Sequence, residues 1–390
     1  MGKFDEIHDR FNTRSVKWDM LQNVFHTEDV LPMWVADMDF QAPQAVNDAI
    51  IDRAKHGFYG YTIFDRDVES AIINWIASHH SWKIESEWLN TSPGVINILH
   101  MAVQAFTEPG DKILIQTPVY TPIYSIIEQH GREAVKNPLV YKDNYYTIDF
   151  EDFEEKLKSG VKVFILCSPH NPVGRVWTKD ELKRIAELCL QYDVLILSDE
   201  IHADLTFPGV QHTPIASLSD EIAQNTVTCM APSKTFNLAG LQASFAITPN
   251  KEKRDQLTTA FRKQGLSMLS TMAITAMEAA YNEGNEWLDE LRSVIKKNEQ
   301  YVRSMFEKHI PSLKVTKTEG TYLLWIDCSA LNMDEKALNQ FMIEKARVGL
   351  NAGVDYGEEG KQIMTMNIAC PKETLEEGVH LIIQAVQTLS

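Results

Sequence analysis

Residues 231–241, APSKTFNLAGL, place Lys234 directly after a short apolar run, residues 226–230, that is typical of a buried strand. A lysine is unusual there, because lysines prefer solvated surfaces and buried lysines lose their charge unless they are paired. A partly desolvated lysine amine is a nucleophile, which Schiff-base chemistry requires. The small residues around Lys234 leave room for a planar ligand. On this stretch alone, a strand-to-loop turn with an exposed lysine is an equally good interpretation.

Polar side chains follow apolar strands four times in the middle of the chain. Strands are expected at residues 112–116, 161–166, 193–197, 226–230 and 243–247. A helix that starts at a capping box, Thr178 with Glu181, is expected between the second and third of them. This alternation predicts an α/β fold with a doubly wound, mostly parallel sheet. Ligands bind at the carboxyl ends of such strands, which predicts a site there. The polar residues at that edge are Tyr120, Asn171, Asp199 and Lys234.

Two further segments are candidates for the same site. A helix is expected to open at residues 92–96, Ser-Pro-Gly-Val-Ile, with Ser92 as its cap and Gly94 allowing a ligand to approach the backbone. The free amide groups at such a helix start favour a phosphate, although most helix starts bind nothing. Residues 57–62, Gly-Phe-Tyr-Gly-Tyr-Thr, form a loop whose aromatic content is typical of an interface or a ligand site.

A chain of 390 residues is too long for one hydrophobic core, so we expect two domains. Residues 1–48 are expected to form an N-terminal arm and part of a smaller domain, and the patch at 31–40 fits neither a helical nor a strand period. A large cofactor-binding domain is expected at residues 49–285. The small C-terminal α/β domain is expected at residues 286–390.

Composition excludes several classes of function. The net charge of −17 opposes binding to nucleic acid or to an anionic membrane. Five cysteines without a CxxC pair are typical of reduced core residues in a cytoplasmic protein. Neither a leader segment nor a membrane span is expected. Asp199-Glu200-x-His202 lacks further ligands, so no metal site is expected.

Pyridoxal 5′-phosphate (PLP) is the ligand whose chemistry fits these residues. Lys234 would hold its aldehyde as a Schiff base, and Asp199 would keep the ring nitrogen protonated, which makes the ring an electron sink. Asn171 would donate a hydrogen bond to the ring hydroxyl, and Tyr120 would stack on a ring face. The residues expected around the phosphate are Gly94, Val95, Ile96 and Ser233.

Three segments, SPHNPVGR at 168–175, SDEIH at 198–202 and SKTFNLAGL at 233–241, resemble class I/II, fold-type I PLP enzymes. PMWVADMDF at 32–40 is closer to one branch, the MalY/PatB-type cystathionine β-lyases, and the resemblance covers essentially the whole chain. It implies a homodimer with the active site at the subunit interface, where Tyr61 reaches the neighbouring subunit's cofactor phosphate. The catalytic residues would then be Lys234, Asp199 and Tyr61. The substrate entrance would include Trp34, Val35 and Ala36.

Four positions depart from the pattern of the wider superfamily. Ala231 and Gln242 stand where a serine and an arginine commonly bind the phosphate, and His202 stands where many relatives carry a tyrosine near the ring hydroxyl. Thr365 stands where an arginine normally clamps the substrate α-carboxylate, and losing such a charged partner typically costs about 2–5 kcal/mol. A cysteinyl-glycine S-conjugate, whose carboxylate lies further away, would not need this arginine.

The function implied by the resemblance is carbon–sulfur β-elimination. The enzyme would cleave cysteine S-conjugates such as cystathionine to a thiol, ammonia and pyruvate, or to a pyruvoyl product from a dipeptide. An aminotransferase shares the lysine, aspartate and asparagine, but the change at Thr365 argues against it. A regulatory role in binding another protein is a third interpretation, which an exposed apolar patch outside the dimer interface would support.

Overall fold

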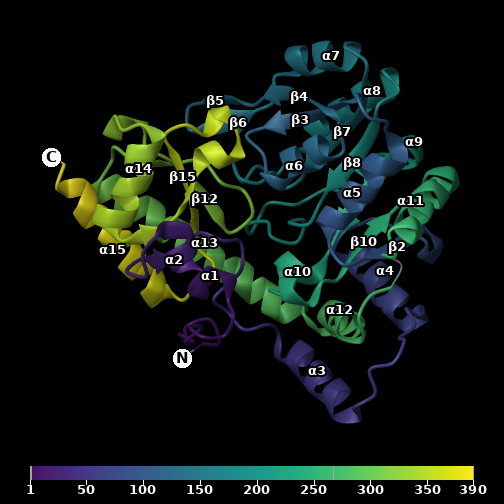
Figure 1. Cartoon of the computed structure of the whole chain (residues 1–390), viewed down its shortest axis with the longest axis horizontal. Helices are drawn as coiled ribbons and strands as arrows, with labels where there is room; N and C mark the ends of the chain where they lie inside the picture. The colour runs from purple at the N-terminus through teal and green to yellow at the C-terminus, as the bar shows by residue number, and fades with distance from the viewer. Residues whose placement is uncertain (1, 267, 390) are drawn as a thin grey trace.

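The computed structural model describes residues 2–266 and 268–389, and a seven-stranded sheet forms its centre (Figure 1). The strand order is β2-β10-β9-β8-β7-β3-β4. All neighbours from β9 to β4 pair in parallel, whereas β10 pairs antiparallel with both β9 and β2. The bounds are β2 (Leu89–Ser92), β3 (Lys112–Thr117), β4 (Glu133–Pro138), β7 (Val161–Cys167), β8 (Leu195–Asp199), β9 (Thr226–Met230) and β10 (Ser244–Ile247). The predicted α/β fold with a mostly parallel sheet is confirmed.

Helices cover both faces of this sheet, because successive side chains of its buried strands point to opposite sides. Ile113 and Ile115 of β3 pack with α5, α6 and α11, whereas Leu114 between them packs with α7 and α8 on the other face. The helices of this part are α4 (Arg66–His80), α5 (Val95–Phe106), α6 (Pro122–Gln129), α7 (Phe150–Lys158), α8 (Lys179–Gln191), α9 (Asp220–Gln224), α10 (Pro232–Thr235), α11 (Lys251–Lys263) and α12 (Thr271–Glu283). The predicted capping box of Thr178 and Glu181 opens α8.

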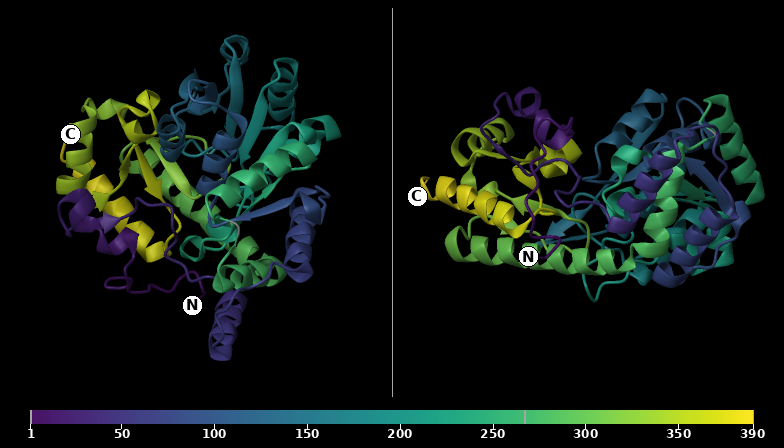
Figure 2. Two further views of the ribbon diagram at one scale, coloured as in Figure 1. Left: turned by 45° about the vertical axis from the view of Figure 1, so that its right-hand side comes forward. Right: turned by 90° about the horizontal axis from the view of Figure 1, so that it is seen from below.

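A second, four-stranded antiparallel sheet lies in the C-terminal part of the chain, in the order β11-β12-β15-β14. The long helix α13 (Asn285–His309) runs from the first sheet's helices to this part, as Figure 2 shows from below. The other elements here are β11 (Lys314–Val315), β12 (Leu323–Asp327), α14 (Glu335–Phe341), β13 (Val348–Gly349), β14 (Asn351–Ala352), β15 (Ile363–Asn367) and α15 (Lys372–Gln387). A hairpin of β5 (Val140–Lys142) and β6 (Tyr145–Thr147) lies between β4 and α7. The domain boundaries at residues 48/49 and 285/286 stay predictions.

The N-terminal segment has more regular structure than its sequence predicts. It contains α1 (Val16–Asp19), α2 (Leu21–Phe25) and β1 (Leu31–Pro32), and β1 pairs in parallel with β13. These elements have two to five residues, which is too short for a period to show in the sequence. They are held by tertiary packing of buried side chains such as Leu21 and Phe25. Helix α3 (Gln44–His56) then projects from the body of the molecule (Figure 1).

Two predicted boundaries near the site are wrong. Ser92 does not cap α5 but is the last residue of β2, paired with Ser244, and Gly94 is the N-cap. The strand expected at 193–197 is β8, shifted two residues along the chain. Asp193 adopts a left-handed φ of 54° in the turn before it, and Asp199 is its final residue rather than the start of a loop.

Within the described residues, no helix combines the length and the apolar character that crossing a bilayer requires. All five cysteines are buried thiols, as expected for core residues.

Candidate active site

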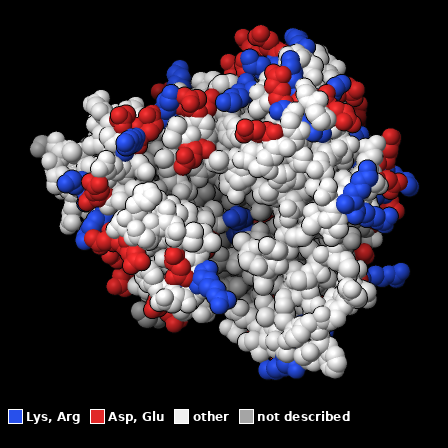
Figure 3. All heavy atoms as spheres, viewed as in Figure 1, with Lys and Arg blue, Asp and Glu red and all other residues white. Residues whose placement is uncertain are grey.

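A cavity of about 180 Å³ lies at the carboxyl ends of β7, β8 and β9, the central strands of the large sheet. Figure 3 shows that the surface is hollowed near the middle of the face seen in Figure 1. Parallel strands bring their carboxyl ends to one edge, so residues far apart in sequence meet there. The predicted site residues that line the cavity are Ala36, Gly94, Val95, Ile96, Tyr120, Asn171, Asp199, His202, Ser233 and Lys234.

Lys234 is carried by α10, a single helical turn that begins at Pro232 directly after β9. Its amine donates a hydrogen bond to the carbonyl oxygen of Ala36 at 2.6 Å. Burial lowers the pKa of Lys234, and the charges of Asp37 and Asp199 oppose that shift. A lowered pKa increases the fraction of neutral amine, which is the form that acts as nucleophile or base.

Asp199 ends β8, the middle strand of the seven, and its side chain is buried. The backbone N–H of Ile201 donates to its Oδ1 at 3.2 Å, and among the described residues Lys234 is the cation that acts on this carboxylate, through its charge and without a hydrogen bond. Burial raises the pKa of Asp199 to about 6, although the Ile201 hydrogen bond lowers it. A buried carboxylate without a directly bonded cation is unfavourable by itself and favours a cation from a ligand.

Two polar atoms in the cavity wall have no partner in this structure. They are Oδ1 of Asn171 and Nδ1 of His202, both buried. Buried polar atoms are nearly always hydrogen-bonded in proteins, so orphaned atoms around one cavity indicate a polar ligand. Burial lowers the pKa of His202 to about 3, so the imidazole is neutral and can accept a hydrogen bond at one ring nitrogen.

Another part of the cavity wall is formed by backbone and uncharged side chains. The N-terminus of α5 opens there at Gly94, and Ser233 and Gln242 lie beside it. The free N–H groups of a helix start attract an anion. Among the described residues that line the cavity, Lys234 is the only lysine or arginine. An anionic group at this part of the wall would therefore be held mainly by N–H and hydroxyl donors.

Four predicted site residues do not line the cavity of this chain. Tyr61 lies in the loop between α3 and α4 with its side chain 97% exposed. Thr365 is fully enclosed in β15, between Trp325 of β12 and Asn351 of β14. The last two are Trp34 and Val35, which precede Ala36 in the arm. The roles assigned to these four residues stay predictions.

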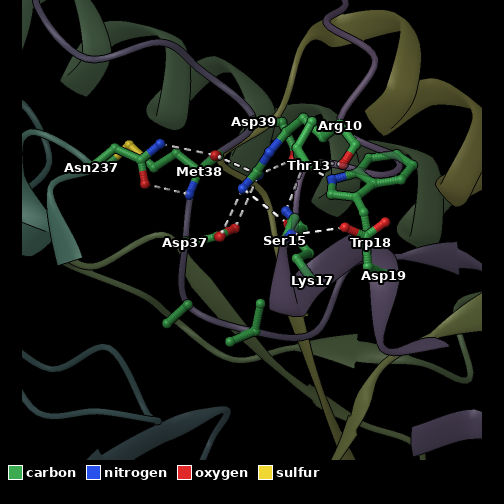
Figure 4. A network of polar contacts seen from close by, with 12 residues as sticks. Arg10, Thr13, Ser15, Lys17, Trp18, Asp19, Asp37, Met38, Asp39 and Asn237 are labelled. Atoms are coloured by element: carbon green, nitrogen blue, oxygen red, sulfur yellow. Dashed lines mark hydrogen bonds and ion pairs between the residues drawn. The ribbon is translucent and has the colours of Figure 1, made fainter. Parts of the chain in front are cut away.

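A network of charged residues that the sequence analysis missed holds the arm over the cavity (Figure 4). Asp39 accepts hydrogen bonds from Arg10 at 2.7 Å, from the amine of Lys17 at 2.7 Å and from the indole of Trp18 at 2.9 Å. Arg10 also pairs with both carboxylate oxygens of Asp37. The network thus ties Asp37 and Asp39, which follow Ala36 in the sequence, to residues 10–18.

Asn237 holds the same arm from the opposite side, three residues after Lys234. Its amide nitrogen donates to the carbonyls of Met38 and Phe40, and its oxygen accepts from the N–H of Met38 (Figure 4). Two acidic residues in the DMDF segment and two basic residues near the N-terminus were the only sequence signal for this arrangement.

Loss of the buried amine of Lys17 should destabilise the protein. Lys17 is 1% exposed, and replacing it by methionine removes one charged hydrogen bond to Asp39 while Arg10 remains. We expect Lys17→Met to lower the free energy of unfolding by about 2–3 kcal/mol, measured by urea unfolding. The control is Lys251→Met, which removes an exposed pair with Asp255 and should change it by less than about 0.5 kcal/mol. Equal effects of the two changes on the free energy of unfolding would contradict a stabilising role for the Lys17–Asp39 bond.

Comparison with known proteins agrees with this site. The family model of aminotransferase class I and II matches residues 28–382. Cystathionine β-lyase PatB of Bacillus subtilis is 47% identical over 380 residues, which cover 97% of this chain and 98% of the relative. The structure of cystalysin from Treponema denticola, described as containing a pyridoxal 5′-phosphate cofactor, superposes with a TM-score of 0.97 at 37% identity and full coverage of both chains.

A further solved structure is the PLP-bound C–S lyase from Staphylococcus hominis, with a TM-score of 0.93 and 31% identity over 99% of this chain and 98% of that chain. The resemblance inferred from the sequence motifs is thereby confirmed. The chain belongs to the aminotransferase class I and II family, and within it to the branch that includes cystathionine β-lyase PatB.

Proposed function

We propose that this chain is a PLP-dependent carbon–sulfur β-lyase, which cleaves cysteine thioethers to a thiol, ammonia and pyruvate. The observation that carries the proposal is the buried carboxylate of Asp199, without a directly bonded cation among the described residues, in one cavity with the desolvated amine of Lys234. The relatives named cystathionine β-lyase and C–S lyase support the reaction type.

The residues present fit PLP as the cofactor. Lys234 would hold its aldehyde carbon, and Asp199 would pair with its ring nitrogen, which supplies the directly bonded cation that the carboxylate lacks. Asn171 would donate its amide N–H to the ring oxygen, and the imidazole of His202, which carries an orphaned ring nitrogen, would donate an N–H to the same oxygen. When bound, PLP supplies an electron sink for negative charge at the substrate α-carbon.

The chain's own residues would supply the proton transfer and the enclosure. The amine of Lys234 takes the proton from the substrate α-carbon as general base, a role that its lowered pKa favours. Tyr120 covers one side of the cavity, and the arm at Ala36 covers the lysine, so both limit the access of water. A thiolate then leaves from the β-carbon with the electron pair of the C–S bond, and one water hydrolyses the released aminoacrylate to pyruvate and ammonia.

We infer a homodimer in which Tyr61 completes the partner's cavity. Tyr61 lies among exposed apolar side chains, Phe58, Tyr59 and Ile63, on a loop that extends from the body of the molecule. Such a contiguous exposed apolar patch is typical of an interface. Light scattering of the purified protein tests the stoichiometry, and a monomer at micromolar concentration would contradict it.

The direct test is the product balance. Cofactor-loaded protein incubated with S-methylcysteine and with cystathionine should release thiol and pyruvate in equal amounts. Amino transfer that requires a keto acid and releases no thiol would favour an aminotransferase instead. Binding of another protein that survives replacement of Lys234 would favour a regulatory role.

The absence of a charged clamp motivates a narrower proposal on the substrate. Thr365 is neutral and enclosed, and Lys234 is the only cation among the described residues of the cavity wall. The α-carboxylate of a free cysteine conjugate therefore has no guanidinium partner there. In a cysteinyl-glycine conjugate the negative charge is on the glycine carboxylate, which lies further away. We expect kcat/KM for a Cys-Gly S-conjugate to equal or exceed that of the free cysteine conjugate with the same thioether. A large preference for the free amino acid would reject the dipeptide proposal and leave the lyase assignment intact.

A further inference from the structure

A second set of buried polar side chains lies behind the cavity and takes no part in the chemistry described so far. Lys234 lines the cavity, whereas its neighbour Thr235 is fully buried and points away from it. The hydroxyl of Thr235 donates to Oδ2 of Asp204 at 2.8 Å. Asp204 is itself buried and does not line the cavity.

Asp204 is bonded on its other carboxylate oxygen as well. Oδ1 accepts from the indole of Trp75 at 3.1 Å and from Nε2 of His80 at 2.9 Å, both on α4. Burial favours the neutral acid, but the bonds from His80, Thr235 and Trp75 outweigh it and hold the pKa of Asp204 well below its usual range. The carboxylate therefore stays charged and keeps all three donors.

Backbone groups at Asp204 and Leu205 form hydrogen bonds with two further segments, α13 and the loop after β8. The side chain of Arg292 on α13 donates to the carbonyl of Asp204 at 2.6 Å. Leu205, the next residue, donates its N–H to the carbonyl of His202, whose side chain lines the cavity. The carboxylate of Asp204 thus joins α4 to α10, and the backbone at Asp204 and Leu205 connects this pair to α13 and to the loop after β8.

Helix α10 depends on such anchors, because it has only four residues and a single turn is not stable by itself. Its position is set by the side-chain bonds of Thr235 and Asn237 to other segments. We propose that Asp204 is a positioning residue which, through the hydroxyl of Thr235, holds α10 so that the amine of Lys234 faces the cavity. This inference rests on the proposed function, because it assigns a positioning partner to the same lysine.

The experiment compares three variants of the cofactor-loaded protein. Thr235→Val removes the hydroxyl and keeps the shape, Thr235→Ser keeps the hydroxyl, and Thr226→Val is the matched control. Thr226 is also fully buried and donates one hydrogen bond at 2.8 Å, to Ile222, but it lies at the start of β9 away from the cavity. The readouts are thermal unfolding, kcat, KM and the fraction of Lys234 that borohydride links to the cofactor, determined by mass spectrometry.

We expect Thr235→Val to lower kcat on the order of 10- to 100-fold, with less effect on KM and a smaller linked fraction. Thr235→Ser should retain most of the wild-type kcat and most of the linked fraction. Thr226→Val should lower the unfolding temperature without changing kcat or the linked fraction. If both valine variants change only the unfolding temperature, or if serine fails to restore kcat, the positioning role is wrong. If Thr235→Val does not fold, Asp204→Asn carries the same expectation for kcat and the linked fraction. A wild-type protein that releases no thiol would overturn the proposed function instead, which keeps the two failures distinct.

Discussion

Replacement of Lys234 by alanine is expected to abolish pyruvate release from cysteine thioethers. Among the described residues of the cavity wall, only Lys234 and His202 have basic side chains. Burial lowers the pKa of His202 to about 3, so its imidazole is a weak base, and the amine of Lys234 is left as the general base. Loss of a positioned general base alone lowers a rate on the order of 10²–10⁴-fold, and the variant also loses the nucleophile that holds the cofactor.

The measurement is kcat for pyruvate release, with cofactor content determined by absorbance. Lys251→Ala serves as the control, because that lysine is exposed on α11 and pairs only with Asp255. Substantial turnover by Lys234→Ala would refute the assigned role of the amine. An unchanged kcat of the Lys251→Ala control would show that the effect is specific to position 234.

Replacement of Asp199 by asparagine is expected to have the second largest effect. The change keeps the shape of the side chain but removes the charge that would pair with the ring nitrogen. Truncating one partner of a buried, hydrogen-bonded charge pair costs about 2–5 kcal/mol, which we expect in kcat/KM for pyruvate release. The control is Asp143→Asn, on the exposed β5–β6 turn, which should leave activity unchanged.

The same residue predicts how cofactor binding depends on pH. Burial raises the pKa of Asp199 to about 6 in the cofactor-free chain. The carboxylate is therefore ionised above pH 6 and becomes protonated as the pH falls through that value, when it can no longer pair with a ring cation. Cofactor affinity of wild-type protein should fall below pH 6, and Asp199→Asn should lack this step. Identical pH profiles for the two proteins would remove Asp199 as the titrating group.

The chemistry of the cavity could be predicted from local sequence. Asn171, Asp199 and Lys234 follow or end short apolar runs, and parallel strands bring such ends together wherever the remaining chain lies. The shift of β8 by two residues did not alter this conclusion, since Asp199 stayed at the carboxyl end. Ser92 was misassigned as a helix cap because its backbone pairs with Ser244, more than 150 residues away.

The networks that hold the site were decided by tertiary structure alone. Asp39 bonds Arg10 and Lys17, and Asp204 bonds Thr235 and His80, across separations that no local period links. Whether a carboxylate is buried and paired depends on which segments pack around it, and its sequence neighbours do not specify that. The sequence by itself therefore determined the fold class and the reactive side chains. Only the packed chain decided how those side chains are anchored, because burial and long-range hydrogen bonds arise when distant segments meet.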